Sequence, residues 1–322
     1  MPALLVSKSP PLSGEVTIHG AKNSVLPILA ATLLCRTPCV LHNCPDILDV
    51  THTRAILHSL GCASERRGAS VYIDPRSCAG HSIPPELAAS MRASSLFLGA
   101  LLARQGEASL SLPGGCPIGA RPVDYHLLAF RALGAEVTET DDTIHCRARR
   151  LTGAKITLPG PSVGATENAM LAAVGAEGVT VIANAACEPE IVDLAGFLTA
   201  CGAKIAGAGT GRVTVKGGQP LTGATYTILP DRIETATFLC ACAACGGTLT
   251  LRRTAPRLAE PILNSLTESG CRFSCTHDTI QISRDGPLIA CRPVVSKPYP
   301  GFPTDAMPVL LASQLRAEGQ TD

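Results

Sequence analysis

Aromatic residues are scarce in this chain: they make up 3% of its 322 residues, and tryptophan is missing. A core must therefore be built from aliphatic side chains and alanine, within a composition that is 46% hydrophobic. The formal net charge is only +1, and no basic run with interleaved aromatics occurs, so nucleic-acid binding is not indicated. The longest apolar runs, Val25–Cys35 and Phe238–Cys245, are too short to cross a bilayer. Met1–Pro10 lacks the apolar core of a signal peptide, so we expect a cytoplasmic protein without a membrane partner.

Cysteine, by contrast, is abundant, with 15 residues. The odd count and the lack of a signal peptide argue against a disulfide framework. Most of these cysteines lie in alanine- and leucine-rich runs, where a free thiol behaves as a small apolar side chain. Cys242 and Cys245 form a lone CxxC pair, whereas a zinc site would need a second pair. We therefore predict no metal site.

A segment of about 70 residues recurs along the chain, which predicts a repeat architecture within a two-domain protein. Each segment has the order strand, helix, strand, helix and two further strands, and a glycine ends the second helix. Helices are predicted to open after Lys22, Arg92, Ser162, Arg232 and Thr304. Strands are predicted at Cys39–Asn43, Val71–Asp74, Ala108–Leu112, Ile144–Ala148, Val179–Asn184, Val213–Lys216, Thr248–Arg252 and Ile280–Ser283.

The helix openings carry a hint of function. A helix N-terminus presents free N–H groups and a partial positive charge, so it attracts anions. Lys22, Arg92 and Arg232 place formal positive charge at the openings of three segments, and residues 162–164 (Ser-Val-Gly) offer a hydroxyl and backbone N–H groups instead. We therefore expect a polyanionic substrate, unless these are ordinary solvated residues of a first helical turn.

One loop concentrates reactive side chains. Residues 113–126 contain two adjacent glycines, Cys116 and Arg121, and then an aspartate and a histidine. Glycine frees backbone N–H groups to face an anion, and an arginine can grip a carboxylate or phosphate with two hydrogen bonds. A nearby cation would also raise the thiolate fraction of Cys116. The alternative is a tight turn with an inert cysteine.

Four short runs resemble the active-site motifs of the enolpyruvyl transferases. They are residues 20–23 (Gly-Ala-Lys-Asn), 91–94 (Met-Arg-Ala-Ser), 114–119 (Gly-Gly-Cys-Pro-Ile-Gly) and 302–305 (Phe-Pro-Thr-Asp), and the resemblance extends from about Ser13 to the last residue. It implies an α/β fold of two inside-out α/β barrels, with helices inside and sheets outside. Residues 22–229 would form the first barrel, and residues 1–21 with 230–322 the second.

The resemblance also implies a reaction. The enolpyruvyl group of phosphoenolpyruvate would be transferred to the 3-hydroxyl of UDP-N-acetylglucosamine, with release of phosphate, by addition and elimination. This is the first committed step of peptidoglycan precursor synthesis, and it implies no cofactor. A sister branch of the family acts on a shikimate phosphate and needs no loop cysteine, so the runs at 20–23 and 114–119 favour the nucleotide-sugar branch.

Residue roles follow from the same resemblance. Cys116 matches the proton donor, which fosfomycin alkylates in these enzymes, and Asp305 matches the base beside the sugar hydroxyl, although a helix-capping role is the alternative. Lys22, Asn23 and Arg121 match the residues that contact phosphoenolpyruvate. Residues that match the UDP-N-acetylglucosamine site are Arg92, Arg121, Pro122, Val123, Asp124, Tyr125, Ser162, Val163, Gly164 and Asp305.

One departure from the family pattern concerns the diphosphate contact. Gly160 and Pro161 stand where some members carry a lysine. The lack of that lysine would weaken the diphosphate contact or shift it to backbone N–H groups.

Glu188, Glu190 and residues 231–234 also match the family pattern, and we interpret them as structural ion pairs between the domains. The predicted repeats stop within the fifth, so we expect a C-terminally truncated enzyme that is inactive as given. The alternatives are a naturally shorter variant and a fragment that only binds UDP-sugar.

Overall fold

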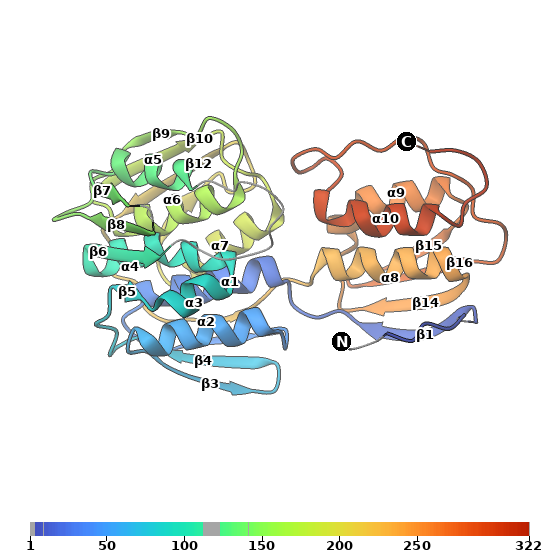
Figure 1. The fold of residues 1–322 in the computed structure, drawn as a ribbon, viewed down its shortest axis with the longest axis horizontal. Coiled ribbons are helices and arrows are strands. Elements are labelled where there is room, and N and C mark those ends of the chain that lie inside the picture. The colour runs from blue at the N-terminus through green and yellow to red at the C-terminus, as the bar shows by residue number, and fades with distance from the viewer. Residues whose placement is uncertain (1–3, 9, 112–122, 141, 322) are drawn as a thin grey trace. The chain divides into compact units, whose positions relative to one another are not determined.

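A computed structural model describes residues 4–8, 10–111, 123–140 and 142–321. The chain divides into two compact units, a larger one of residues 20–229 and a smaller one of residues 1–19 and 230–322 (Figure 1). Residues 20 and 21 belong to the larger unit, unlike the boundary expected from sequence. The N–H of Ala21 donates to the carbonyl of Leu229 at 2.8 Å. A Cβ on Gly20 would lie 1.7 Å from the carbonyl oxygen of Asn43, so only glycine fits there.

The larger unit contains three four-stranded sheets with one shared pattern. In each, the first two strands are parallel and the remaining neighbours are antiparallel. The chain's last strand in this unit, β13, completes the first sheet by pairing with β2. The sheets are β13 (Thr225–Thr227), β2 (Cys39–His42), β4 (Ser70–Asp74), β3 (Ala63–Arg67); β5 (Ser82–Ile83), β6 (Glu107–Ser111), β8 (Thr143–Arg147), β7 (Glu136–Glu139); and β9 (Lys155–Thr157), β10 (Gly178–Ala183), β12 (Arg212–Gly217), β11 (Lys204–Ala206).

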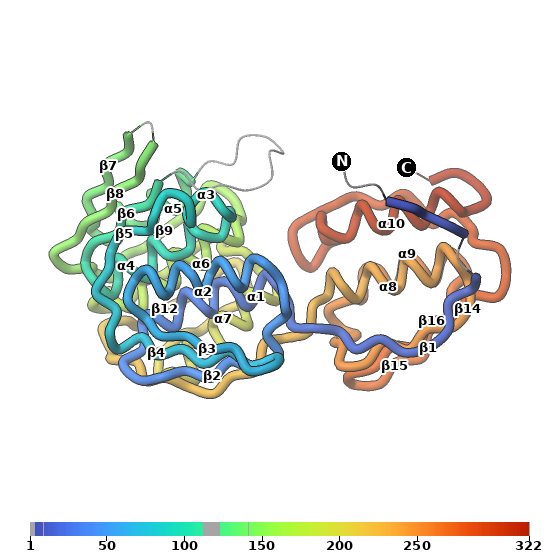
Figure 2. Tube along the Cα trace, turned by 60° about the horizontal axis from the view of Figure 1, so that its bottom comes forward, coloured from blue at the N-terminus to red at the C-terminus, as the bar shows by residue number. Residues whose placement is uncertain are grey.

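The helices of the larger unit supply about half of its buried core residues. In α1 every residue from Ser24 to Ala31 is buried, and helices α1 and α2 lie side by side (Figure 2). Helices α4 and α6 approach closely because glycine and alanine line their contact: a Cβ on Gly99 would lie 2.5 Å from the carbonyl oxygen of Asn168. Small side chains therefore replace aromatic bulk in this core. The helices are α1 (Lys22–Ala31), η1 (Thr32–Leu34), α2 (Leu48–Ser59), α3 (Pro85–Ser90), η2 (Arg92–Leu96), α4 (Phe97–Gln105), α5 (Asp124–Ala132), α6 (Val163–Gly175) and α7 (Pro189–Ala200).

The smaller unit repeats the same sheet pattern once. Its strand order is β1, β14, β16, β15, with β1 parallel to β14 and the other pairs antiparallel. Helices α8 and α9 pack on this sheet, and α10 packs on α8 (Figure 1). The elements are β1 (Leu12–Thr17), α8 (Arg232–Cys245), β14 (Gly247–Arg252), η3 (Pro256–Ala259), α9 (Glu260–Glu268), β15 (Arg272–Cys275), β16 (Thr279–Arg284), η4 (Thr304–Ala306) and α10 (Met307–Gln314).

The strands predicted from sequence are confirmed, each to within one residue at either end, apart from Leu112, which lies outside the described residues. The predicted helix openings are confirmed to within one residue, at the starts of α1, η2, α6, α8 and η4. Within the described ranges, no helix is both long enough and apolar enough to cross a bilayer.

Candidate active site

The predicted site residues fall on both units. Cys116, Arg121 and Pro122 belong to residues 112–122, which lie outside the described part of the chain. Asp305 lies in the smaller unit, and all the others lie in the larger one. The two sets are therefore described separately.

Lys22 and Asn23 are the first two residues of α1. The first turn of this helix holds no acidic residue, so the partial positive charge of its N-terminus adds to that of Lys22. Lys22 Nζ lies 3.1 Å from Asp49 Oδ2 at the start of α2, and its side chain remains 53% exposed. An ion pair this exposed holds the ammonium weakly, so an incoming anion can compete with Asp49 for it.

A buried histidine joins the other predicted segments of the larger unit. His126 lies in the first turn of α5, directly after Val123, Asp124 and Tyr125. Burial and then the charge of Arg92 lower the pKa of His126 to about 4, so its imidazole is neutral at pH 7. A neutral imidazole adds no positive charge beside Arg92.

Asn168, on α6, holds that imidazole in place. Its Nδ2 donates to His126 Nδ1 at 2.7 Å and to the carbonyl of Ser95 at 3.0 Å. Its Oδ1 accepts from the N–H of Gly99 at 2.8 Å. Both donor hydrogens and the acceptor are used, and His126 must carry its proton on Nε2. One buried amide thus connects α5, α6 and the η2–α4 segment.

The opening of α6 completes this arrangement. Ser162 is its N-cap, and its Oγ accepts from the N–H of Ala165 at 3.4 Å. A Cβ on Gly164 would lie 3.1 Å from His126 Cε1, so glycine is what lets the imidazole lie against the start of α6. The structure therefore brings together the segments of Arg92, residues 123–126 and residues 162–164.

From sequence alone, His126 is only a neighbour of the predicted site residues, and no role is predicted for Asn168. A signal for Asn168 does exist in the sequence: it is an amide within an alanine-rich helix that is otherwise buried. A buried amide needs partners, so such a residue marks a polar network.

Three carboxylates gather at α6: Glu167 belongs to this helix, and Glu188 and Glu190 lie at the start of α7. Glu167 is fully buried, and burial followed by the nearby charges of Glu190 and Glu188 raises the pKa of Glu167 well above its ordinary value. Glu167 Oε1 and Glu188 Oε2 have no hydrogen-bond partner among the described residues. Glu167 therefore retains a proton in the folded state at pH values where the unfolded chain has lost it.

This predicts a pH-dependent stability. Because the folded-state pKa is raised, Glu167 contributes fully to the free energy of unfolding below its unfolded pKa of about 4.3. This contribution is lost as pH rises through the folded pKa, and the free energy of unfolding falls by at most about 1.4 kcal/mol per pH unit. The change Glu167→Gln should flatten the decline of the melting temperature above pH 5, as measured by thermal melts. The exposed Glu86→Gln is the matched control, and a curve for Glu167→Gln parallel to that of the unchanged chain would contradict the prediction.

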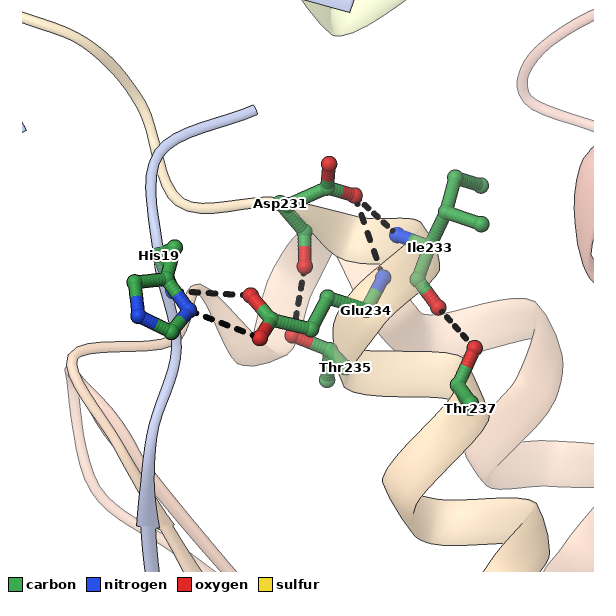
Figure 3. A network of polar contacts seen from close by, with 6 residues as sticks. All are labelled: His19, Asp231, Ile233, Glu234, Thr235 and Thr237. Atoms are coloured by element: carbon green, nitrogen blue, oxygen red, sulfur yellow. Dashed lines mark hydrogen bonds and ion pairs between the residues drawn. The ribbon is translucent and has the colours of Figure 1, made fainter. Parts of the chain in front are cut away.

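In the smaller unit, Asp231 and Glu234 make contacts at the start of α8. Asp231 caps α8, since its Oδ1 accepts from the N–H groups of Ile233 at 2.7 Å and Glu234 at 3.1 Å. The carboxylate of Glu234 contacts both the Nδ1 and the N–H of His19 at 2.8 Å, within the same unit (Figure 3). These contacts hold the segment that follows β1 against the start of α8.

Asp305 lies in η4, directly before α10. The N-cap position of η4 is occupied by Pro303 and that of α10 by Ala306, so Asp305 is not the helix cap considered from sequence. Its carboxylate is exposed in a short turn, a position suited to a chemical role.

Comparison with known proteins supplies the wider context. The model of the EPSP synthase (3-phosphoshikimate 1-carboxyvinyltransferase) family matches residues 6–322. A curated relative, UDP-N-acetylglucosamine 1-carboxyvinyltransferase 2 of Caldanaerobacter subterraneus subsp. tengcongensis, is 46% identical over 308 residues, which cover 96% of this chain and 74% of that relative.

Solved structures share the fold. The enolpyruvyl transferase NikO from Streptomyces tendae superposes with a TM-score of 0.85 at 24% identity, over 97% of this chain and 74% of that one. An EPSP synthase from Acinetobacter baumannii gives a TM-score of 0.70 at 19% identity, over 96% of this chain and 72% of that one. At such identities these two similarities concern the fold alone.

Proposed function

The chain belongs to the EPSP synthase family of enolpyruvyl transferases, and from this we propose that it transfers the enolpyruvyl group of phosphoenolpyruvate to the 3-hydroxyl of UDP-N-acetylglucosamine. The observation that carries the choice of acceptor is the 46% identity, over 96% of the chain, to a relative named for that activity. The EPSP synthase structure from Acinetobacter baumannii is 19% identical to this chain. The product would serve peptidoglycan precursor synthesis in the cytoplasm.

The proposed chemistry divides into anion binding and proton transfer. Lys22 and Asn23, at the positive end of α1, bind phosphoenolpyruvate together with Arg121. Cys116 delivers a proton to C3 of the enol while the sugar 3-hydroxyl adds to C2, and Asp305 accepts the proton of that hydroxyl. Phosphate then leaves C2 of the tetrahedral adduct while C3 loses a proton, which restores the C2–C3 double bond. The cations stabilise the charge that develops on the phosphate as it departs.

The nucleotide sugar is proposed to bind the segments that meet at His126. Arg92 faces the diphosphate, and the opening of α6, with Ser162, Val163 and Gly164, offers backbone N–H groups to the same anion. The run Pro122, Val123, Asp124 and Tyr125 holds the uracil. The neutral imidazole of His126 keeps this charge pattern constant near neutral pH, because it gains a proton only in acid.

The proposal includes the architecture. Residues 20–229, which carry the cysteine loop and the nucleotide-sugar site, form an inside-out α/β barrel, and the smaller unit, which contributes Asp305, is built from the same repeated unit. Support for helices on the inside comes from α1 and α6, which are buried along most of their length. Alternating burial along β4, β6 and β12 supports sheets with one face outward.

Phosphate release tests the proposal directly. The purified chain is incubated with phosphoenolpyruvate and either UDP-N-acetylglucosamine or shikimate 3-phosphate, and inorganic phosphate is measured. Release with the nucleotide sugar alone, lost in the matched Cys116→Ala variant, would support the proposal and overturn the expectation that the chain is inactive. Release with shikimate 3-phosphate instead would identify the sister activity. Calorimetric binding of UDP-N-acetylglucosamine without phosphate release would reduce the function to sugar binding. The absence of both binding and phosphate release would refute the proposed function.

A further inference from the structure

A pair of thiols meets where α2 ends, away from the residues assigned above. Cys62 follows the last turn of α2, and Cys78 lies in the loop after β4. The two thiol groups lie within hydrogen-bonding reach of each other. Cys62 is 3% exposed and Cys78 is 9% exposed, so only the second borders solvent.

Close backbone packing fixes this pair. The carbonyl of Leu60 accepts from the N–H groups of both Ala79, at 3.1 Å, and Gly80, at 3.2 Å. A Cβ on Gly61 would lie 2.6 Å from the carbonyl oxygen of Ser77. The loop that carries Cys78 is therefore held against the end of α2, which keeps the two thiols next to each other.

Cys78 also lines a pocket of about 470 Å³. Two arginines, Arg36 and Arg104, and the amides of Gln105 and Gln219 give this pocket a polar, cationic wall. The pocket is thus suited to small anionic molecules. Small solutes that enter this pocket can therefore reach Cys78.

The wall of the pocket favours a thiolate on Cys78 rather than on Cys62. Gln105 Nε2 lies 3.6 Å from Cys78 Sγ and donates to the Cys78 carbonyl at 3.0 Å. The guanidinium of Arg104 is fixed nearby by the carbonyls of Leu33, Cys35 and Pro75, each at 2.8–2.9 Å. A hydrogen bond from Cys62, then Gln105 and the charge of Arg104, lowers the pKa of Cys78, while that of Cys62 is raised.

We propose that Cys78 and Cys62 form a reactive dithiol, in which Cys78 is modified by anionic low-molecular-weight disulfides that enter this pocket and Cys62 resolves the adduct. The Cys78 thiolate attacks one sulfur of the small disulfide, whose S–S bond breaks and releases one thiolate. Cys62 then loses its proton and attacks the Cys78 sulfur, which releases the second thiolate. Two protein thiols are oxidised to one disulfide, and the small disulfide is reduced to two thiols.

Mass spectrometry of the full chain tests this, with glutathione disulfide as the probe. After incubation and alkylation of the remaining thiols, we expect a Cys62–Cys78 cross-linked peptide that dithiothreitol removes. In Cys62→Ser, the mixed disulfide should accumulate on Cys78, because nothing resolves it. In Cys78→Ser, modification of Cys62 should be at least about 10-fold slower, because its thiol is buried and protonated. Thermal melts establish that both variants are folded.

A second buried thiol group supplies the internal control. Cys35, Cys39 and Cys201 also lie within hydrogen-bonding reach of one another, but only Cys78 among the four lines the pocket. A disulfide within that group, with Cys62 and Cys78 both alkylated, would overturn the proposal. So would a Cys62→Ser chain that is folded and carries no adduct on Cys78.

Discussion

Replacing Asp305 by asparagine is expected to lower kcat for enolpyruvyl transfer by about 10²–10⁴-fold, with little change in the KM for UDP-N-acetylglucosamine. Asparagine has nearly the same shape, so the turn before α10 is retained. An amide, however, cannot accept the proton of the sugar 3-hydroxyl. The loss should therefore appear in the chemical step, and phosphate release at saturating substrate measures it.

A matched control lies in the same unit. Asp285 is an exposed aspartate that forms a surface ion pair with Arg272, remote in sequence from η4. Asp285→Asn should leave kcat within about twofold, because exposed ion pairs contribute little to stability. An Asp305→Asn chain with unchanged kcat would remove Asp305 as the base, and a rise in KM alone would reassign it to sugar binding.

The second large effect concerns stability. Asn168→Leu should lower the free energy of unfolding by about 3–5 kcal/mol, since it strands the N–H of Gly99, the carbonyl of Ser95 and His126 Nδ1 without their partner. Leucine fills a similar volume, so lost hydrogen bonds rather than a cavity dominate the change. Denaturant or thermal unfolding measures it.

The control for this substitution is Asn264→Leu, at an exposed position of α9, for which we expect a change within about 0.5 kcal/mol. A second readout links Asn168 to the nucleotide-sugar site. An imidazole released from Asn168 no longer lies fixed between Arg92 and Gly164, so binding of UDP-N-acetylglucosamine should weaken in calorimetry. Equal stability of the Asn168→Leu and Asn264→Leu chains would show that the amide network contributes nothing.

Much of the fold could be predicted because its signals are local. Strands such as Val213–Lys216 are marked by alternating apolar residues, and helices open at cap-like residues such as Ser162. The N-terminus of a helix carries a partial positive charge whatever the tertiary structure is. Lys22 and Arg92, at two such positions, could therefore be recognised as anion-binding candidates from sequence. The motif at residues 114–119 identified the family before any contact was known.

The sequence by itself thus determined the repeated unit, its elements and the charges at their openings. Only the tertiary structure decided which segments meet: β13 with β2, Asn168 with His126, Gly164 with the imidazole, and Cys62 with Cys78. The physical reason is the range of the interactions. Propensity and capping act between residues a few positions apart, whereas these partners are brought together by the close packing of small-residue helices and of sheets, which no local pattern specifies.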